Sequence, residues 1–168
     1  MSNNLQFEFI VNKESNTVNV VREFSANIEL VWDAWTKPEI IDQWWAPKPW
    51  RAQTKSMDFR EGGFWLYAMV GPENEQHWGR QDYEKVVFKK IFSGTDAFCD
   101  DHGNINESLP KTLFQNEFSE TNGKTIVSIT SKYASLEMLE KIIEMGFKEG
   151  FTMALENLDH LLTNLKTT

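Results

Sequence analysis

The side chains best able to do chemistry are scattered along this sequence and form no recognisable catalytic set. His77, His102 and His160 are far apart and lack the spacing of metal ligands, so no metal site is expected. Cys99 is the only cysteine, and its acidic neighbours would raise the pKa of the thiol and weaken it as a nucleophile. No serine lies in a nucleophile elbow, and no glycine-rich phosphate loop occurs. We therefore expect neither a cofactor nor a known catalytic mechanism.

Arg60 belongs to the most distinctive local motif of the sequence, the stretch 58–63, which ends in two glycines. Asp58 and Arg60 are two residues apart and therefore share one face of a strand. One interpretation is a salt bridge that braces a tight turn at the glycines. The other is that Arg60 stands at the mouth of a cavity and binds a carboxylate or phosphate of a ligand.

Tyr67 belongs to an aromatic strand in which Trp65, Tyr67 and Met69 point to one face. These side chains could be pure core, or they could form one wall of a ligand cavity with the Tyr67 hydroxyl as its polar group. His77 begins the next strand and could lie in the same cavity, although no partner would make it a general base. An enzyme in this cavity would need a polar cluster that converges on one point. The candidates for that cluster are His77, Tyr67, Arg60 and Glu84.

Aromatic residues are unusually frequent, with seven tryptophans and twelve phenylalanines. Such a composition predicts either a core of large rings or a cavity lined by them. Trp44, Trp45 and Trp50 cluster near the end of the predicted short helices, and the adjacent Trp44 and Trp45 cannot both point inward. We expect one of this pair to cover the core and the other to stand at a pocket entrance or at a protein-binding surface.

The C-terminal residues 135–165 are predicted to form the helix around which the elements that carry these candidate residues are organised. Apolar or small residues recur there at steps of three and four, which is the spacing of one helix face. A single helix of this length would be roughly 45 Å long. Gly146 and Gly150 would share one face, where they could allow either close packing against a strand or a void that a ligand occupies. In the second case Phe147, Phe151 and Met153 would flank the void, and at least one of them should line it.

The remaining elements are predicted to form an antiparallel sheet that covers this helix. Strands are predicted at residues 5–11, 17–24, 51–59, 64–70, 77–91, 92–100, 111–120 and 124–134, with short helices at 28–35 and 36–45. Asn122-Gly123 between two alternating runs predicts a tight hairpin. Strands segregated from helices in this way give an α+β fold. The prediction is a curved sheet of about seven strands wrapped around the long helix, with two short helices after the first sheet strand.

Length and charge restrict the functions that the chain can have. The 168 residues suffice for one domain, predicted to span 1–168 with its core at 17–165 and an N-terminal strand and turn at 5–16. A net charge of -8 argues against binding to nucleic acid or to anionic membranes. No signal peptide or membrane-spanning segment is recognised, and a lone cysteine is typical of a reducing compartment. We therefore expect a cytoplasmic location.

Several motifs resemble one known family, and they occur in the right order. They are Trp32-Asp33-Ala34-Trp35-Thr36-Lys37-Pro38-Glu39, Trp44-Trp45-Ala46-Pro47, Asp58-Phe59-Arg60-Glu61-Gly62-Gly63, Trp78-Gly79 with Tyr83, and Gly146-Phe147-Lys148-Glu149-Gly150-Phe151. Over about residues 17–165 the chain resembles the bacterial and archaeal branch of the Hsp90 ATPase activator-like family, within the START-like, birch-pollen-allergen-like superfamily. The resemblance implies a helix-grip fold, in which a seven-stranded antiparallel sheet grips the C-terminal helix and leaves a cavity between them.

The resemblance narrows the function less than the fold, because relatives bind lipids, sterols or plant hormones, cyclise polyketides, or serve as ring-hydroxylase domains. The leading hypothesis is a protein that binds a small apolar or amphipathic molecule in the cavity. The alternatives are a cyclase or hydrolase that uses the same cavity, and an interaction module related to chaperone activation, with a protein partner or a homodimer. An interaction module should expose an apolar patch, most plausibly around Trp44 and Trp50. The residues predicted to contact the ligand are Trp45, Arg60, Trp65, Tyr67, Met69, His77, Gly146, Phe147, Gly150 and Phe151.

Overall fold

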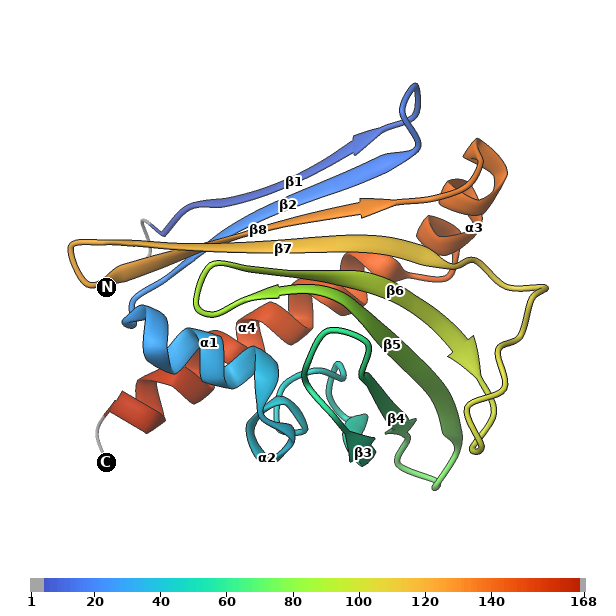
Figure 1. Ribbon diagram of the computed structural model, residues 1–168, viewed down its shortest axis with the longest axis horizontal. Helices are drawn as coiled ribbons and strands as arrows, with labels where there is room; N and C mark the ends of the chain where they lie inside the picture. Colours follow the sequence, from blue (N-terminus) through green and yellow to red (C-terminus); the bar gives the residue numbers. More distant parts are fainter. Residues whose placement is uncertain (1–4, 167–168) are drawn as a thin grey trace.

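The computed structural model describes residues 5–166, so the ends of the predicted domain 1–168 lie outside the described residues. In this part of the chain, eight strands form one antiparallel sheet and four helices accompany it (Figure 1). The elements are β1 Phe7–Asn12, β2 Thr17–Phe24, α1 Ile28–Thr36, α2 Pro38–Ile41, β3 Arg51–Met57, β4 Phe64–Val70, β5 Gln76–Val87, β6 Ile91–Cys99, β7 Thr112–Thr121, β8 Lys124–Lys132, α3 Leu136–Glu144 and α4 Phe147–Lys166. The predicted α+β class is therefore confirmed.

The strands lie in the order β1-β2-β8-β7-β6-β5-β4-β3, so consecutive hairpins run from β3 to β8 and β2 closes against the last strand. The sheet has eight strands rather than about seven, because β1 pairs along its whole length with β2. The short helices consequently follow the second strand of the sheet. The hairpin predicted at Asn122-Gly123 is confirmed, and both residues have the positive φ that such a turn requires.

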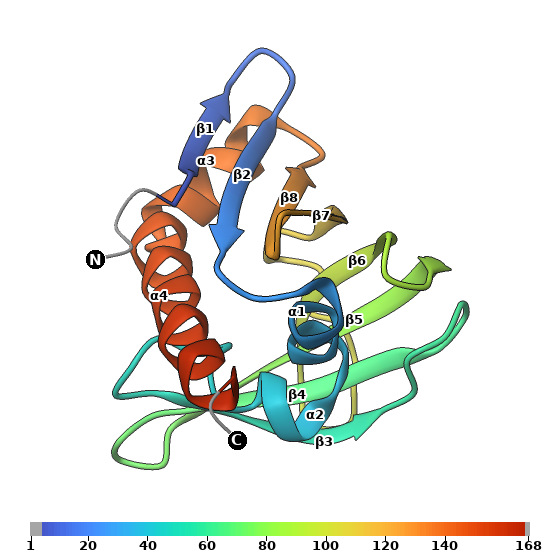
Figure 2. The same ribbon diagram turned by 90° about the vertical axis from the view of Figure 1, so that its left-hand side faces the viewer.

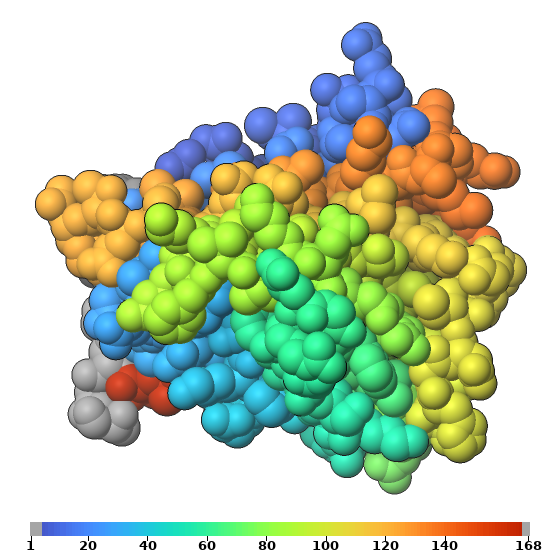
Figure 3. All heavy atoms as spheres, viewed as in Figure 1, coloured from blue at the N-terminus to red at the C-terminus, as the bar shows by residue number. Residues whose placement is uncertain are grey.

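The sheet is curved, and α4 lies on its concave side. Figure 2 shows the strands in profile as an arc that opens toward α4, and Figure 3 shows that the strands hide nearly all of α4 from the opposite side. Bulges in β3 (Thr54/Ser56) and β5 (Tyr83/Lys85) add local twist that helps the sheet to bend. The residues that α4 buries are all apolar. They are Ala154, Leu155, Leu158 and Leu162.

The C-terminal helix is not continuous, and this corrects the prediction of one helix over 135–165. Gly146 has a φ of 92°, a conformation that ends α3 and starts α4 in a new direction. The amide of Gly146 donates to the carbonyl of Ile143 at 3.0 Å, which closes the last turn of α3. Gly146 therefore sits at the junction, only Gly150 lies within α4, and the two glycines do not share one helix face. The apolar spacing alone could not reveal this break, because it continues through the junction.

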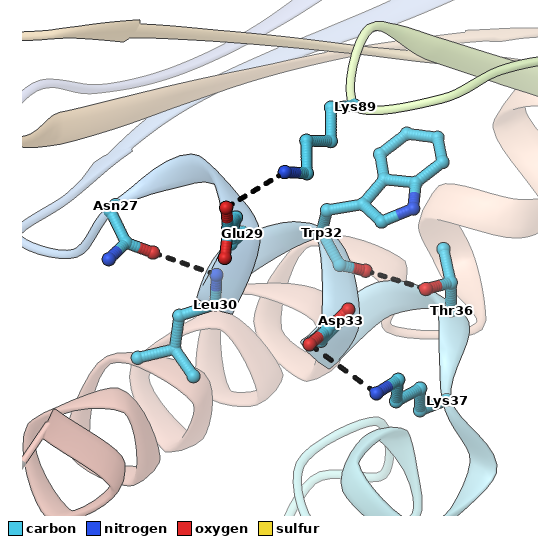
Figure 4. A network of polar contacts seen from close by, with 8 residues as sticks. All are labelled: Asn27, Glu29, Leu30, Trp32, Asp33, Thr36, Lys37 and Lys89. Carbon is cyan, nitrogen blue, oxygen red and sulfur yellow. Dashed lines mark hydrogen bonds and ion pairs between the residues drawn. The ribbon is translucent and has the colours of Figure 1, made fainter.

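Helix α1 is fixed at both ends and pinned to the sheet (Figure 4). The side chain of Asn27 accepts a hydrogen bond from the amide of Leu30, as expected for the N-cap. Glu29 pairs with Lys89 in the turn between β5 and β6, at 3.0 Å. The buried ring of Trp32 packs edge-on against phenylalanines from the sheet and its loops. These contacts bring the C-terminal end of α1, including Trp35, to the interior.

The second short helix is only one turn long, in contrast to the prediction of a helix over 36–45. Its N-cap is Lys37, which has no side-chain capping bond, and the Thr36 hydroxyl instead donates to the carbonyl of Trp32 at 2.8 Å. The chain then turns through Trp44, which is fully buried and donates from its indole to the carbonyl of Ala34. Its neighbour Trp45 is half-buried, so the pair divides as expected.

Candidate ligand-binding site

A cavity of about 440 Å³ lies between the concave face of the sheet, the segment that follows α2, and the junction of α3 and α4. This volume falls in the usual range of small-molecule sites, and the wall is mostly apolar. The cavity opens beside two exposed side chains, His77 and Met145. Its lining residues are Trp35, Trp45, Pro47, Trp50, Tyr67, Met69, His77, Trp78, Gly79, Gln81, Asp96, Phe98, Pro110, Thr112, Phe114, Asn116, Ile129, Ser131, Tyr133, Ile142, Met145, Gly146, Phe147, Gly150 and Phe151.

The sheet contributes a polar row to this otherwise apolar wall. Gln81 of β5 is paired with Asp96 of β6, and Asp96 is paired with Thr112 at the start of β7. Residues paired directly across an antiparallel sheet point to the same face, so the three side chains face the cavity together. Asn116 lies further along β7, is 4% exposed, and makes no side-chain hydrogen bond within the described residues.

Gly79 lets Tyr67 join the polar row from the neighbouring strand. Tyr67 and Gly79 are paired across β4 and β5, and a Cβ at Gly79 would lie 2.7 Å from the Tyr67 hydroxyl oxygen. The phenol ring therefore lies over β5, where its hydroxyl donates to Asp96 at 3.4 Å from both carboxylate oxygens. Burial, reinforced by the nearby charge of Asp96, raises the pKa of Tyr67 well above its ordinary value. Tyr67 thus acts as a neutral donor.

Asp96 is the ionisable centre of the cavity. Burial raises the pKa of its carboxyl to about 6, against the opposing effect of hydrogen bonds from Gln81 and Tyr67. The side-chain amide of Gln81 donates to Asp96 Oδ2 at 2.9 Å, and Gln81 is itself buried. Asp96 keeps some accessible surface because it lines the cavity, while protein surrounds it on the other sides. Among the described residues it takes part in no ion pair of 4 Å or less.

Two tryptophans of the cavity wall carry indole donors that are shut off from solvent. Trp35 and Trp45 line the cavity with other ring atoms, while their indole nitrogens are buried and find no hydrogen-bond partner among the described residues. The indole of Trp45 lies close to the Tyr67 hydroxyl and opposes the rise of its pKa, without reaching the geometry of a hydrogen bond. By contrast, Trp65 donates to the Thr54 hydroxyl at 2.9 Å. Buried donors are normally paired in proteins, so these two indole nitrogens are exceptions within the core.

The helical side of the cavity is shaped by its glycines and by stacked phenylalanines. A Cβ added at Gly146 would meet no atom within 4 Å, and one at Gly150 would only touch Pro47 at 3.7 Å. Close packing against a strand therefore does not require either glycine. Phe147 and Phe151 stack on each other with ring centroids 5.4 Å apart, and both line the cavity. The local geometry agrees with the interpretation of an open space beside the glycines.

The structure places eight of the ten predicted contact residues on the cavity wall and two elsewhere. Arg60 is exposed and binds Asp58 at 2.7 Å, which is the turn-bracing salt bridge rather than a cavity-mouth residue. Trp65 is fully buried behind Tyr67, with the two rings stacked at 4.1 Å, so it supports the wall without reaching the space. The residues that do line the cavity are Trp45, Tyr67, Met69, His77, Gly146, Phe147, Gly150 and Phe151.

The polar cluster that an enzyme was expected to need is not assembled as predicted. His77 and Tyr67 line the cavity, but Arg60 does not, and Glu84 is exposed. The polar residues actually present, above all Asp96, were not predicted, because they come from three different strands and face one another only through the register of those strands. The strict alternation of β6 with its neighbours could have suggested them, but the bulge in β5 obscures which residues face inward.

Some kinds of site find no support among residues 5–166. No group of three or more histidine, cysteine, aspartate or glutamate side chains there could hold a metal ion. Cys99 is a free thiol whose pKa is raised to about 11, mainly by burial, which makes it a poor nucleophile. In the same described part, no helix combines the length and apolarity needed to cross a bilayer.

Comparison with known proteins identifies the family. The family described as Activator of Hsp90 ATPase homolog 1-like protein matches residues 25–163. Protein Ms6760 from Mycobacterium smegmatis is 29% identical, with a TM-score of 0.86 over 94% of this chain and 96% of that one. A protein from Arthrobacter aurescens, solved by NMR, is 28% identical, with a TM-score of 0.88 over 94% of this chain and 91% of that one.

A protein from Staphylococcus epidermidis is likewise 28% identical, with a TM-score of 0.80 over 92% of this chain and 93% of that one. A comparison with curated proteins finds no match. The family match spans most of the chain, and the structural likeness covers both chains almost completely, as the resemblance of the motifs predicted. This chain therefore belongs to the Activator of Hsp90 ATPase homolog 1-like family.

Proposed function

We propose that this protein binds a small amphipathic molecule in the cavity between the sheet and the helices. The observation that carries the proposal is a space of about 440 Å³ whose mostly apolar wall includes the polar side chains of Gln81, Asp96 and Asn116. Protein interiors are normally packed without large voids. A ligand with a ring-sized apolar body and a polar end would fill the space and meet those groups.

Family membership fits a ligand-binding or activator-type module, and the cavity favours the first. An interaction module was expected to expose an aromatic patch around Trp44 and Trp50. Trp44 is instead fully buried, and Trp50 lines the cavity beside His77, with ring centroids 5.3 Å apart. The proposal treats residues 1–168 as one cytoplasmic binding domain and includes neither a protein partner nor a second copy.

Filling the cavity from α4 tests the proposal. Gly150→Leu places an isobutyl group into the open space beside Pro47, so it should lower the affinity for an uncharged fluorescent probe, N-phenyl-1-naphthylamine, by at least about tenfold. Because leucine is a better helix former than glycine by about 1 kcal/mol, the free energy of unfolding should hold or rise. Probe fluorescence and urea denaturation measure the two effects.

Met153→Leu is the matched control, since Met153, which was expected to flank the void, is instead an exposed residue of the same helix outside the cavity lining. It should leave both the affinity and the stability unchanged. Probe binding that is equally strong in Gly150→Leu would show that the probe lies elsewhere, and absence of binding to the wild type would count against the proposal. A large loss of stability in Gly150→Leu would mean that the space beside Gly150 is already occupied.

A further inference from the structure

The fixed charge on the cavity wall is negative. Asp96 is the only carboxylate among the lining residues, and no lysine or arginine lines the space. The only basic side chain there is His77, which is exposed at the opening. An anionic ligand would therefore bring its charge against Asp96 without a fixed cation to receive it. The net charge of -8 acts in the same direction, because it attracts cations and repels anions at long range.

Asp96 also lacks a cationic partner from the protein itself. Its short hydrogen bond, from Gln81, goes to Oδ2, while Oδ1 is approached only by the Tyr67 hydroxyl at 3.4 Å. The nearby Arg80 lies on the opposite face of the sheet, because it precedes Gln81 in the same strand. Its guanidinium is already engaged by Asp82 at 2.6 and 2.9 Å. A carboxylate buried without a counter-charge is costly, and a cation supplied by the ligand would remove that cost.

The aromatic rings around this carboxylate suit a cation as well. Trp45 stands edge-on to Tyr67, whose hydroxyl contacts Asp96, and to Phe151, with ring centroids 6.3 and 6.2 Å away, so these rings line the same cavity as the carboxylate. Aromatic faces attract ammonium groups, most strongly where water is excluded.

From this arrangement we infer that the ligand is a protonated amine on an aromatic body. The ammonium group pairs with Asp96 beside Tyr67, and the aromatic body lies against Phe147 and Phe151. The inference rests on the proposed function, since it assigns a ligand class to the same cavity. It excludes fatty acids and aromatic acids as preferred ligands. No bond is made or broken, and the protein acts as a selective binder.

Three naphthalene compounds of nearly equal size test the inference by isothermal titration at pH 7.5. They are 2-(1-naphthyl)ethylamine, 2-(1-naphthyl)ethanol and 1-naphthylacetic acid, which differ mainly in the charge of the polar end. We expect the amine to bind at least about tenfold tighter than the alcohol, and the acid to bind weakest. Asp96→Asn should bring the amine down to the affinity of the alcohol, while the alcohol itself keeps its affinity. That unchanged alcohol binding shows that the variant is folded and its cavity open.

Asp101→Asn is the charge control, because it removes one negative charge from an exposed side chain outside the cavity. It should leave the preference for the amine intact. An amine preference that persists in Asp96→Asn, or that is lost equally in Asp101→Asn, would overturn the inference in favour of general attraction to an acidic protein. Equal affinities for amine and alcohol would also overturn it and leave cavity binding standing. If neither these compounds nor N-phenyl-1-naphthylamine binds, the proposed function itself fails.

Discussion

A single missing side chain organises the polar wall of the cavity. Gly79 allows the ring of Tyr67 to lie across β5 and to direct its hydroxyl at Asp96. The motif Trp78-Gly79 was visible in the sequence, but its meaning depends on which residue faces Gly79 from the next strand. Alternation correctly grouped Tyr67 with Met69 and with Trp65, yet it could not separate a cavity residue from one packed behind it. Residue types predict the face of a strand, whereas the depth of a side chain depends on the packing around it.

Gly79→Ala should therefore be destabilising. The added methyl group would lie 2.7 Å from the Tyr67 ring and hydroxyl, so the tyrosine must move away from Asp96. We expect a loss of about 1–3 kcal/mol in the free energy of unfolding, as for other overpacked positions. Gly150→Ala is the control, since its methyl group has ordinary contact distances and should stabilise α4 by up to about 1 kcal/mol. Urea denaturation of both variants measures the contrast, and equal effects would contradict it.

Asp96 should make stability depend on pH in a direction opposite to that of a salt-bridged carboxylate. Its pKa is about 6 in the folded protein and near the ordinary 3.8 in the unfolded chain, because burial disfavours the charge. The folded state therefore holds the proton more tightly, and the resulting stability is complete below about pH 4 and lost as the pH rises through about 6. The difference corresponds to at most about 3 kcal/mol, reduced by whatever water enters the cavity.

Comparison with Asp96→Asn isolates this contribution, since asparagine keeps an acceptor for Gln81 and carries no charge. The free energy of unfolding of the wild type, minus that of the variant, should fall by up to about 3 kcal/mol between pH 4 and pH 7. Urea denaturation at a series of pH values measures the difference, which cancels the titration of the other carboxylates. A difference that stays flat, or that increases with pH, would mean that Asp96 is not desolvated.

At the scale of elements, the break between α3 and α4 decides where the cavity lies. A continuous helix would carry residues 136–144 straight past the sheet, whereas the turn at Gly146 lays α3 beside the end of β8 (Figure 1). Leu139 of α3 is fully buried in this position, and Ile142 lines the cavity. The amphipathic spacing predicted both helices as one, because it reports which residues are buried and not whether the axis bends. The bend arises from the positive φ of Gly146, which the apolar spacing does not report.

Substitutions at Gly146 should be ranked by their tolerance of a positive φ. Space is not the obstacle, since an added Cβ would meet nothing within 4 Å. The left-handed conformation costs an alanine about 1 kcal/mol, an asparagine less and a β-branched valine more. Thermal or urea unfolding should therefore rank stability as wild type, then Gly146→Asn, Gly146→Ala and Gly146→Val. Equal stability of all three variants would show that the junction is not held by the conformation of this residue.

For the molecule as a whole, the order and class of the elements could be predicted, because turn signals and alternation are local. The strand at 5–11 was predicted, but it was not counted in the main sheet, because β1 joins that sheet only through its pairing with β2. The position of the Asp96 carboxylate in the cavity wall was missed for a similar reason. Asp96 faces inward because of its register with Gln81, and the bulge at Tyr83/Lys85 interrupts the pattern that would have revealed this. Register is a property of pairs of strands, so single-strand patterns cannot supply it.

The pairing of β2 with β8 also bears on when the binding site comes into existence. Val20 is matched with Ile129, so one of the first strands to be synthesised finds its partner only after most of the chain has followed. Such distant pairings are slow to form, because a long loop must close before any contact rewards it. Hairpins from β3 to β7 can assemble earlier, but the curved sheet cannot receive α4 until β8 joins its two halves. On the ribosome, the cavity should therefore be among the last features to appear, and a nascent chain released before β8 should expose its aromatic wall to chaperones.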